Sequence, residues 1–229
     1  MAAASTYREE QDRVLDLISK SDATTRNRVK NWLNLGYQDF VLRELWPFRE
    51  TTGTLNLVQG TQEYDLSTNF ADIDEQNITA VSIQGAAQRK LTYWPFNQLR
   101  ASQPDLDSAG ESTPERYYLK SGSIGFWPVP NATPAVFIDY FKVPTEMSDD
   151  SDTPIIPTAY RESLIHYALS MEHDYNGDPD LAIKAMNRYE QIVTLARQNL
   201  LSQPGDTGAF RILGPADSRD WTGLSSEVR

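Results

Sequence analysis

The two histidines of the chain, His166 and His173, are the residues best suited to metal binding or acid–base chemistry. Both fall in a segment with helical periodicity, and at about 100° per residue they lie with Glu162 within about 40° of one face. Two imidazoles and a carboxylate could hold Zn²⁺ and leave one position open for water. The spacing lacks the HExxH pattern of helical zinc sites, which favours a polar ridge beside an apolar stripe.

A second candidate metal site is the run of alternating oxygen ligands that follows this segment: Asp174, Asn176, Asp178 and Asp180. In a calcium loop with this alternation, Pro179 would stand where a Gly is needed and Ala185 where the bidentate Glu is needed. The pattern instead favours a helix boundary, with Gly177 ending one helix and Asp178 capping the next, which Pro179 opens. We therefore expect no metal and no other cofactor.

The acidic cluster Asp149, Asp150 and Asp152 could in principle supply a general acid and base, which needs a cleft and a raised pKa. Its position between two periodic segments favours a solvated linker, at residues 147–153. The sequence contains no GxSxG, P-loop or GxGxxG motif. A Ser–His–Asp triad has no sequence signature, and no segment points to one. The sequence thus predicts that the protein is not an enzyme.

Aromatic side chains in the middle of the chain are a candidate ligand site, because they could stack on sugars or bases. They are Tyr93, Trp94, Tyr117, Tyr118, Phe126, Trp127 and Tyr140. Aromatics are also enriched in cores and subunit interfaces, and this second interpretation is favoured. A carbohydrate- or receptor-binding module remains the alternative function, and a metal-dependent hydrolase using Glu162, His166 and His173 a third.

The composition limits the class of protein. The 229 residues include no cysteine and carry a formal net charge of −11, which argues against tight, non-specific nucleic-acid binding. The absence of cysteine fits folding in a reducing cytoplasm. We expect no membrane span and no signal peptide, because no run of 18 apolar residues occurs and the N-terminus is charged. Residues 52–153 carry fourteen acidic and six basic side chains, which suggests a distinct domain.

The first fifty residues predict two helices. One runs from Tyr7 to Lys20, and Asp22 or Thr24 can cap the next. The second helix has one apolar face at 3.6-residue periodicity, formed by Val29, Trp32, Leu33, Gly36, Tyr37, Phe40 and Val41. Pro47 ends it.

The middle of the chain predicts short strands. Alternation on both sides of Gly60 indicates a hairpin, and Ser121-Gly122 indicates a second one between 116–120 and 123–127. Further strands are expected at 78–83 and 91–94, with a brief helix at 95–102 and a loop at 102–115. The strand at 135–143 is apolar on both faces, so it is central or faces another subunit. About seven short strands favour a small barrel or sandwich.

The last third predicts two more helices and a tail. Helix three begins at Pro157 and has an apolar stripe of Tyr160, Leu164, Tyr167, Ala168, Met171 and Tyr175. Helix four has a stripe of Ala182, Ala185, Met186, Tyr189, Ile192, Val193, Ala196 and Leu200, and Pro204-Gly205 ends it. Residues 204–229 lack periodicity but contain Phe210, Ile212, Leu213, Trp221 and Leu224. A solvated tail rarely carries so many large apolar groups, so these need a partner.

The order and spacing of several motifs resemble the head-to-tail adaptor (connector) proteins of tailed bacteriophages, over about residues 7–203. The motifs are Trp46-Pro47-Phe48, the turn with Gly60, Tyr64 and Leu66, the runs 112–118, 124–130 and 136–143, Pro157, and Gly177-Asp178-Pro179. No single motif is diagnostic of the family. Residues 204–229 match only in kind, as a C-terminal arm.

This resemblance implies an α+β fold: an antiparallel or orthogonal bundle of about four helices, an inserted all-β domain and an extended C-terminal arm. The bundle would comprise residues 1–51 and 154–203, the β-domain residues 52–153, and the arm residues 204–229. The resemblance also implies a ring, usually of twelve copies, below the portal protein in the head–tail neck of the virion. Such a ring extends the DNA channel and gives tail or nozzle proteins a platform.

Two groups of residues are candidates for partner contacts. Arms of these adaptors commonly reach the portal, which makes Phe210, Ile212, Leu213, Trp221 and Leu224 the predicted portal anchors. The residues predicted to lie in the core or in the ring interface are Trp32, Tyr37, Trp46, Phe48, Phe137 and Phe141. The acidic surplus suits a conduit for DNA, because lumenal carboxylates repel phosphates and no sequence-specific binding is expected.

Overall fold

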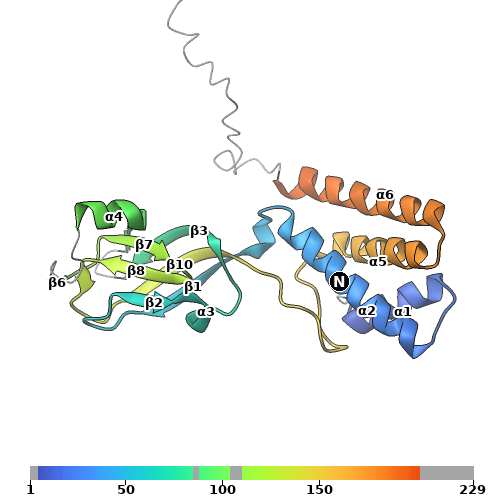
Figure 1. Ribbon diagram of the computed structural model, residues 1–229, viewed down its shortest axis with the longest axis horizontal. Helices are drawn as coiled ribbons and strands as arrows, with labels where there is room; N and C mark the ends of the chain where they lie inside the picture. Colours follow the sequence, from blue (N-terminus) through green and yellow to red (C-terminus); the bar gives the residue numbers. More distant parts are fainter. Residues whose placement is uncertain (1–4, 85–87, 104–109, 202–229) are drawn as a thin grey trace, which may run out of the picture.

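The computed structural model describes residues 5–84, 88–103 and 110–201. Helices gather at one end of an elongated molecule and β-sheets at the other (Figure 1). The helical region consists of α1 (Tyr7–Leu17), α2 (Ala23–Leu42), α5 (Glu162–Tyr175) and α6 (Pro179–Ala196). The β region comprises β1 to β10 with the short helices α3 (Leu66–Asn69) and α4 (Phe96–Ser102). The predicted mixture of helices and strands is confirmed.

Local side-chain hydrogen bonds determine where the first helices begin. Thr6 and Glu9 form a capping box at α1, with the Glu9 N–H donating to Thr6 Oγ1 and the Thr6 N–H to Glu9 Oε2. Asp22 caps α2 by accepting from the Thr25 N–H at 2.8 Å, as predicted. α1 ends three residues before the predicted Lys20, because Ser19 takes a positive φ of 54°.

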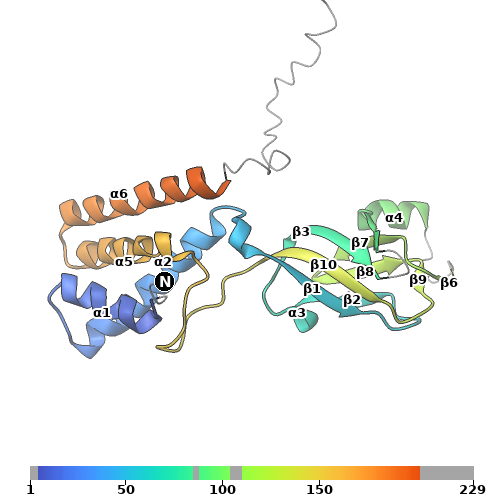
Figure 2. The ribbon, with the colours of Figure 1, turned by 180° about the vertical axis from the view of Figure 1, so that it is seen from behind.

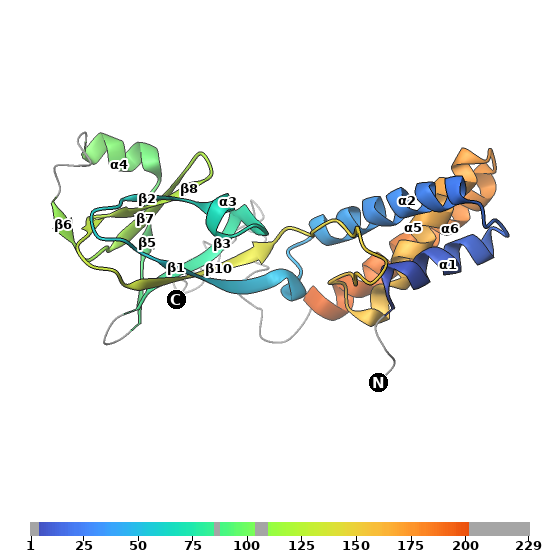
Figure 3. The same ribbon diagram turned by 90° about the horizontal axis from the view of Figure 1, so that it is seen from below.

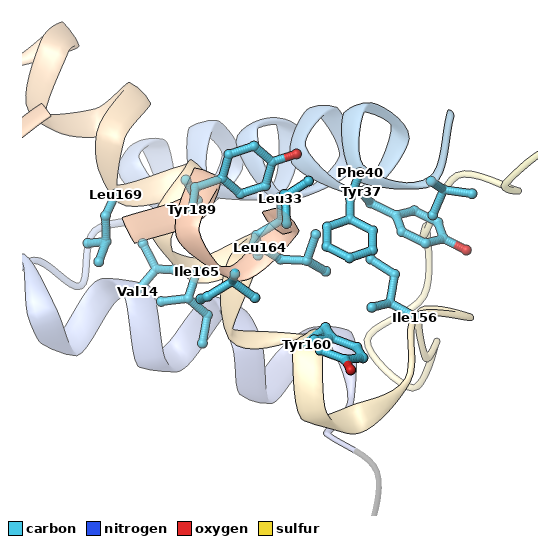
Figure 4. Packing of buried hydrophobic residues seen from close by; sticks show 14 of the residues in the cluster. Val14, Leu33, Tyr37, Phe40, Ile156, Tyr160, Leu164, Ile165, Leu169 and Tyr189 are labelled. Atoms are coloured by element: carbon cyan, nitrogen blue, oxygen red, sulfur yellow. The ribbon is translucent and has the colours of Figure 1, made fainter. Parts of the chain in front are cut away.

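The four longer helices enclose one apolar core. Figure 4 shows Val14 of α1, Leu33 and Phe40 of α2, and Leu164 and Leu169 of α5 within it. The predicted stripes of α2 and α6 supply most of their buried residues. The stripe predicted for α5 is partly wrong, since Tyr175 is 61% exposed whereas Ile165 and Leu169 are buried. α5 contacts α1, α2 and α6, so its buried face is wider than one stripe.

Two four-stranded sheets form the β region. The first has the order β1 (Glu50–Asn56), β10 (Ala135–Lys142), β3 (Ile73–Ile83), β4 (Arg89–Lys90). The second has the order β2 (Glu63–Asp65), β8 (Ser123–Trp127), β7 (Arg116–Lys120), β5 (Thr92–Tyr93). β6 (Glu111–Ser112) pairs with β9 (Val129–Pro130). The sheets share a core that includes Val136, Ile138, Ile124 and Phe126, which makes this region the sandwich alternative of the prediction (Figure 3).

Strand pairing corrects one predicted hairpin and confirms the other. The hairpin across Gly60 is wrong, because β1 pairs with β10 and β2 with β8. Gly60, at φ 76°, turns the chain from one sheet to the other. The hairpin of β7 and β8 is confirmed, with positive φ at both turn residues, Ser121 and Gly122. β10 is the central strand that its two apolar faces predict.

The two regions are joined by two crossings of the chain. On one side, the 3₁₀ turn η1 (Pro47–Arg49) leads into β1, and on the other, β10 leads through residues 143–157 to the 3₁₀ turn η3 (Thr158–Tyr160) and α5. The crossings are neighbours, because Glu50 of β1 pairs with Phe141 of β10. At the far end of α6, the π-helical turn η4 (Arg197–Leu201) ends the described chain.

The second crossing is hydrogen-bonded to the helices, but its side chains are mostly solvated: Met147 is buried, whereas residues 148–151 and 153 are exposed, as predicted for a solvated linker at 147–153. Buried Asn34 of α2 donates from Nδ2 to the Met147 carbonyl at 2.9 Å and accepts from the Met147 N–H at 3.0 Å. The Tyr7 N–H donates to the Asp152 carbonyl at 2.8 Å. A single buried amide thus satisfies both backbone groups of Met147, which allows this polar segment to lie against the core.

Candidate functional site

The two histidines do not form a metal site. His166 Nε2 lies 3.5 Å from Glu162 Oε1, and burial lowers the pKa of His166, so the ring is predominantly neutral at pH 7. His173 is in the last turn of α5. In the described ranges, no group of three or more histidine or acidic side chains is arranged to hold a metal ion.

The alternating residues after α5 act as a helix boundary. Gly177 has φ 83°, and its N–H donates to the Asp174 carbonyl at 3.0 Å. Asp178 occupies the N-cap position of α6 and Pro179 opens the helix, as predicted. The predicted capping by the Asp178 side chain is wrong, because that side chain makes no capping hydrogen bond.

The acidic cluster forms ion pairs and turn contacts instead of a catalytic pair. Asp150 binds Lys30 Nζ at 3.2 Å and an Arg8 nitrogen at 3.1 Å, and these bonds, that of Lys30 foremost, lower the pKa of Asp150. Asp152 accepts from the N–H groups of Ser148 and Asp149 at 2.8 Å. A lowered pKa at Asp150 is the opposite of the raised pKa that a general acid at neutral pH requires.

The aromatic side chains of the β region pack mostly on each other. The Trp94 and Trp127 rings are 5.7 Å apart, and the Arg116 guanidinium lies 3.9 Å from the Trp94 ring centre. Tyr118 is fully buried and donates to Glu63. Of the seven aromatic candidates, Tyr93 is the one classed as exposed, at 48%. The set therefore lacks the row of open rings that a sugar-stacking surface needs.

The residues predicted for the core or the ring interface divide into two groups. Tyr37, Trp46 and Phe141 are buried, and Trp46 stacks between Phe40 and Phe48 at ring distances of 5.2 and 5.9 Å. Trp32, Phe48 and Phe137 are half-buried. Phe137 points away from the sandwich core, between Thr54 and Ser82 of the neighbouring strands, and a ring contact through this face stays a prediction.

A buried arginine at the junction between the two regions was missed by sequence reasoning. Arg49 is 1% exposed. Its guanidinium donates to the carbonyl oxygens of Val41 in the last turn of α2 and of Glu44 just after it. It also donates to the Lys142 carbonyl in β10 and to Asp74 Oδ2 in β3, and all four distances are 2.8 to 3.2 Å. Its sequence signal is an arginine directly after Pro47-Phe48, where a helix stops and its last carbonyls lack partners.

A second buried charge lies on α1. The Glu10 carboxyl is fully buried, with one oxygen accepting from Ser5 Oγ at 3.1 Å and the other without a hydrogen-bond partner. Burial raises the pKa of Glu10 to about 7. The ionised form is thus held in the folded protein at a cost, which the nearby cations Arg161 and Arg13 reduce.

We expect a Glu10→Gln substitution to remove a pH dependence of stability. The folded protein binds a proton at Glu10 up to about pH 7, while the unfolded chain releases it near 4.5, so the free energy of unfolding falls as the pH rises through this window. The loss is on the order of 1–3 kcal/mol, and the neutral amide avoids it. Urea denaturation at pH 5, 7 and 8 gives the free energy of unfolding of the unaltered protein and of the Glu10→Gln variant. If this free energy changes with pH by the same amount in both proteins, Glu10 is not the group responsible.

The predicted portal anchors, Phe210, Ile212, Leu213, Trp221 and Leu224, lie outside the described residues. In the parts of the chain that are described, no helix is long and apolar enough to cross a membrane.

Comparison with known proteins gives one family. The sequence model of the SU10 adaptor protein family matches residues 5–213, which include all the helices and strands described above. No individually curated protein matches the sequence. Because the match spans nearly the whole chain, this protein belongs to the SU10 adaptor protein family of bacteriophage structural proteins.

Proposed function

We propose that this protein is a head-to-tail adaptor that forms a ring, of about twelve copies, below the portal in the neck of the virion. The ring would extend the DNA channel and give tail or nozzle proteins a platform, after assembly in the host cytoplasm. The observation that carries the proposal is the family match over residues 5–213.

The molecule has features that suit such a ring component. Its shape is elongated, with the helical region and the β region joined by two adjacent crossings (Figure 1). We propose that residues 1–51 and 154–203 form one domain, and that residues 52–153 project from it as an inserted domain. The net charge of −11 per copy suits a conduit along which DNA slides, wherever that charge lines the channel.

The proposal is tested by size-exclusion chromatography with light scattering, on the chain alone and after mixing with its cognate portal. Co-elution at about one copy per portal subunit supports the adaptor function. A folded protein that does not associate with portal contradicts it. The result would then favour the alternative of a carbohydrate- or receptor-binding module, which a glycan array tests.

Deleting residues 204–229 is expected to abolish portal binding without unfolding the protein. The core clusters of the described chain lie within residues 7–201, so the truncated chain keeps its core. Each buried apolar anchor of the arm would contribute about 1.5–3 kcal/mol to binding. Binding to immobilised portal is measured for the truncated chain and for a chain with alanine at Phe210, Ile212, Leu213, Trp221 and Leu224.

A control chain carries Ser218→Ala and Ser225→Ala in the same arm and should bind portal as the unaltered chain does. Undiminished binding by the truncated chain would show that the arm is not the portal anchor.

A further inference from the structure

The helical region carries exposed basic side chains that form no ion pair with a described residue. Most of its described arginines and lysines contact a carboxylate or backbone carbonyls. Arg13 of α1 and Lys184 and Arg188 of α6 are exposed and make no ion pair with any described residue. Arg188 makes one hydrogen bond, to Gln191. Unpaired cations are unexpected in a chain with a net charge of −11.

These cations share one surface with exposed leucines. Arg13 and Arg188 both contribute to lowering the pKa of His166 on α5, and α5 packs against both α1 and α6, so the two arginines flank that helix. Leu181, Arg188 and Leu195 are seven residues apart and therefore form one stripe along α6. Leu181 and Leu195 are 46% and 49% exposed, and Arg188 and Leu195 line a hollow of about 620 Å³. We call this surface the basic face.

The second crossing carries a counterpart of opposite charge. Glu146, Asp149 and Asp152 have no cationic partner among the described residues, unlike Asp150. Val143 and Ile155, 39% and 38% exposed, line a hollow of about 550 Å³ together with Glu146 and Asp152. We call this surface the acidic face.

One lysine also lines the hollow of the acidic face. This residue, Lys142, forms an ion pair with Asp72 at 3.1 Å and therefore does not neutralise Glu146, Asp149 or Asp152.

The α6 part of the basic face and the acidic face lie on different sides of the molecule. In Figures 1 and 2, α6 runs along the upper side of the helical region, while α1 and the chain between β10 and α5 pass along the lower side. Neither face therefore covers the other within one chain. Two different, complementary patches on one chain are what a head-to-tail contact between copies requires.

We propose that the basic face of one copy docks on the acidic face of the next, an inference that rests on the ring of the proposed function. Three cations meet three carboxylates, and Leu181 and Leu195 meet the aliphatic lining of the 550 Å³ hollow. A repeated contact of this kind closes into a ring when its rotation divides a full turn. The opposed charges set the register of neighbouring copies, so association weakens as salt is added.

Disulfide trapping tests the contact directly, because the chain contains no cysteine. A chain with both Asp149→Cys and Lys184→Cys is expected to give, after mild oxidation, a ladder of covalent oligomers on a non-reducing gel. Each single variant should stop at dimers, and high salt during oxidation should shorten the ladder. A matched control with Thr52→Cys and Lys184→Cys places one cysteine on the exposed face of β1 and should give no ladder. Equal ladders from both pairs, or none from the first, overturn the proposal.

Charge reversal gives an independent test. Arg13→Glu with Arg188→Glu, or Glu146→Lys with Asp149→Lys, should each weaken association at least tenfold in sedimentation equilibrium, and the four changes combined should restore it. These side chains are exposed, and circular dichroism checks that each variant folds. Binding of short duplex DNA is measured for the unaltered chain and for the Arg13→Glu, Arg188→Glu variant. If the unaltered chain binds the DNA and the variant does not, the basic face is a DNA contact and the proposal is overturned.

Trapping on immobilised portal separates this inference from the proposed function. A portal-bound ring without the 149–184 disulfide overturns the contact proposed here and leaves the adaptor function standing. A ladder in solution without portal binding supports the contact and contradicts the adaptor function.

Discussion

Replacing Arg49 by Met is expected to lower the free energy of unfolding by about 3–5 kcal/mol, the range for removing one partner of a buried ion pair. Arg49 is 1% exposed and donates to three backbone carbonyls and to Asp74. Methionine fills much of the same space but donates nothing. Asp74 keeps its hydrogen bonds from Asn77 and the Gln76 N–H, but it loses its cation.

The substitution should also loosen the attachment of the β region to the helical region, because two of the four acceptors lie at the end of α2 and directly after it, and the other two lie in β10 and β3. Hydrogen exchange of the amides around Glu44 and Lys142 is expected to rise more than that of amides within α5. Arg49→Lys should recover only part of the stability, since an ammonium has three donors and no planar fork.

A matched control for this experiment is Lys120→Met. Lys120 pairs with Glu63 at 3.2 Å, but both side chains are exposed, and such a pair contributes about 0–1 kcal/mol. Urea denaturation gives the free energy of unfolding of both variants. A loss for Arg49→Met as small as that of the control would show that the four hydrogen bonds contribute little.

Replacing Gly125 by Ala is expected to lower the free energy of unfolding by about 1–3 kcal/mol, the usual effect of overpacking. A Cβ atom at Gly125 would lie 2.1 Å from Cζ of the Tyr118 ring. That ring is fully buried, packs against Phe96 at 5.3 Å and donates to Glu63. To admit the methyl group, the ring has to leave this position and give up both contacts.

A double-mutant cycle separates this clash from other effects of the methyl group. In a Tyr118→Ala background the ring is absent, so Gly125→Ala should be neutral or stabilising, because glycine weakens a strand interior. The coupling free energy of the cycle should therefore be close to the whole cost of the single change. Additive effects of the two substitutions would contradict the close approach.

The sequence predicts the elements of this fold better than their pairing. The helical stripes of α2 and α6 and the hairpin of β7 and β8 follow from local periodicity and turn chemistry. The pairing of β1 with β10 joins residues 50–56 to 135–141, and no local signal connects them. The same holds for the segment at 147–153, whose attachment depends on Asn34, more than a hundred residues earlier.

The basic face could not be predicted from the sequence, because its recognition also depends on contacts between residues that are distant along the chain. An unpaired cation cannot be distinguished from a paired one in sequence, because most partners of the paired arginines are distant along the chain. Arg28 with Glu172 is one example, and Arg43 with Glu190 another. Lys184 and Arg188 therefore stand out only once those pairs are known. The arm residues from Phe210 to Leu224 stay predictions.

The adjacency of the two crossings has a consequence for how such a protein diversifies. The stretch from Glu50 to Lys142 is connected to the helical region at one place, through two strands, β1 and β10, that are hydrogen-bonded to each other. A stretch of this kind can be exchanged as a cassette, since a short turn or a foreign hairpin could bridge the same two positions without threading the helices. Recombination between related genomes could therefore replace the β region while the helical region stays unchanged.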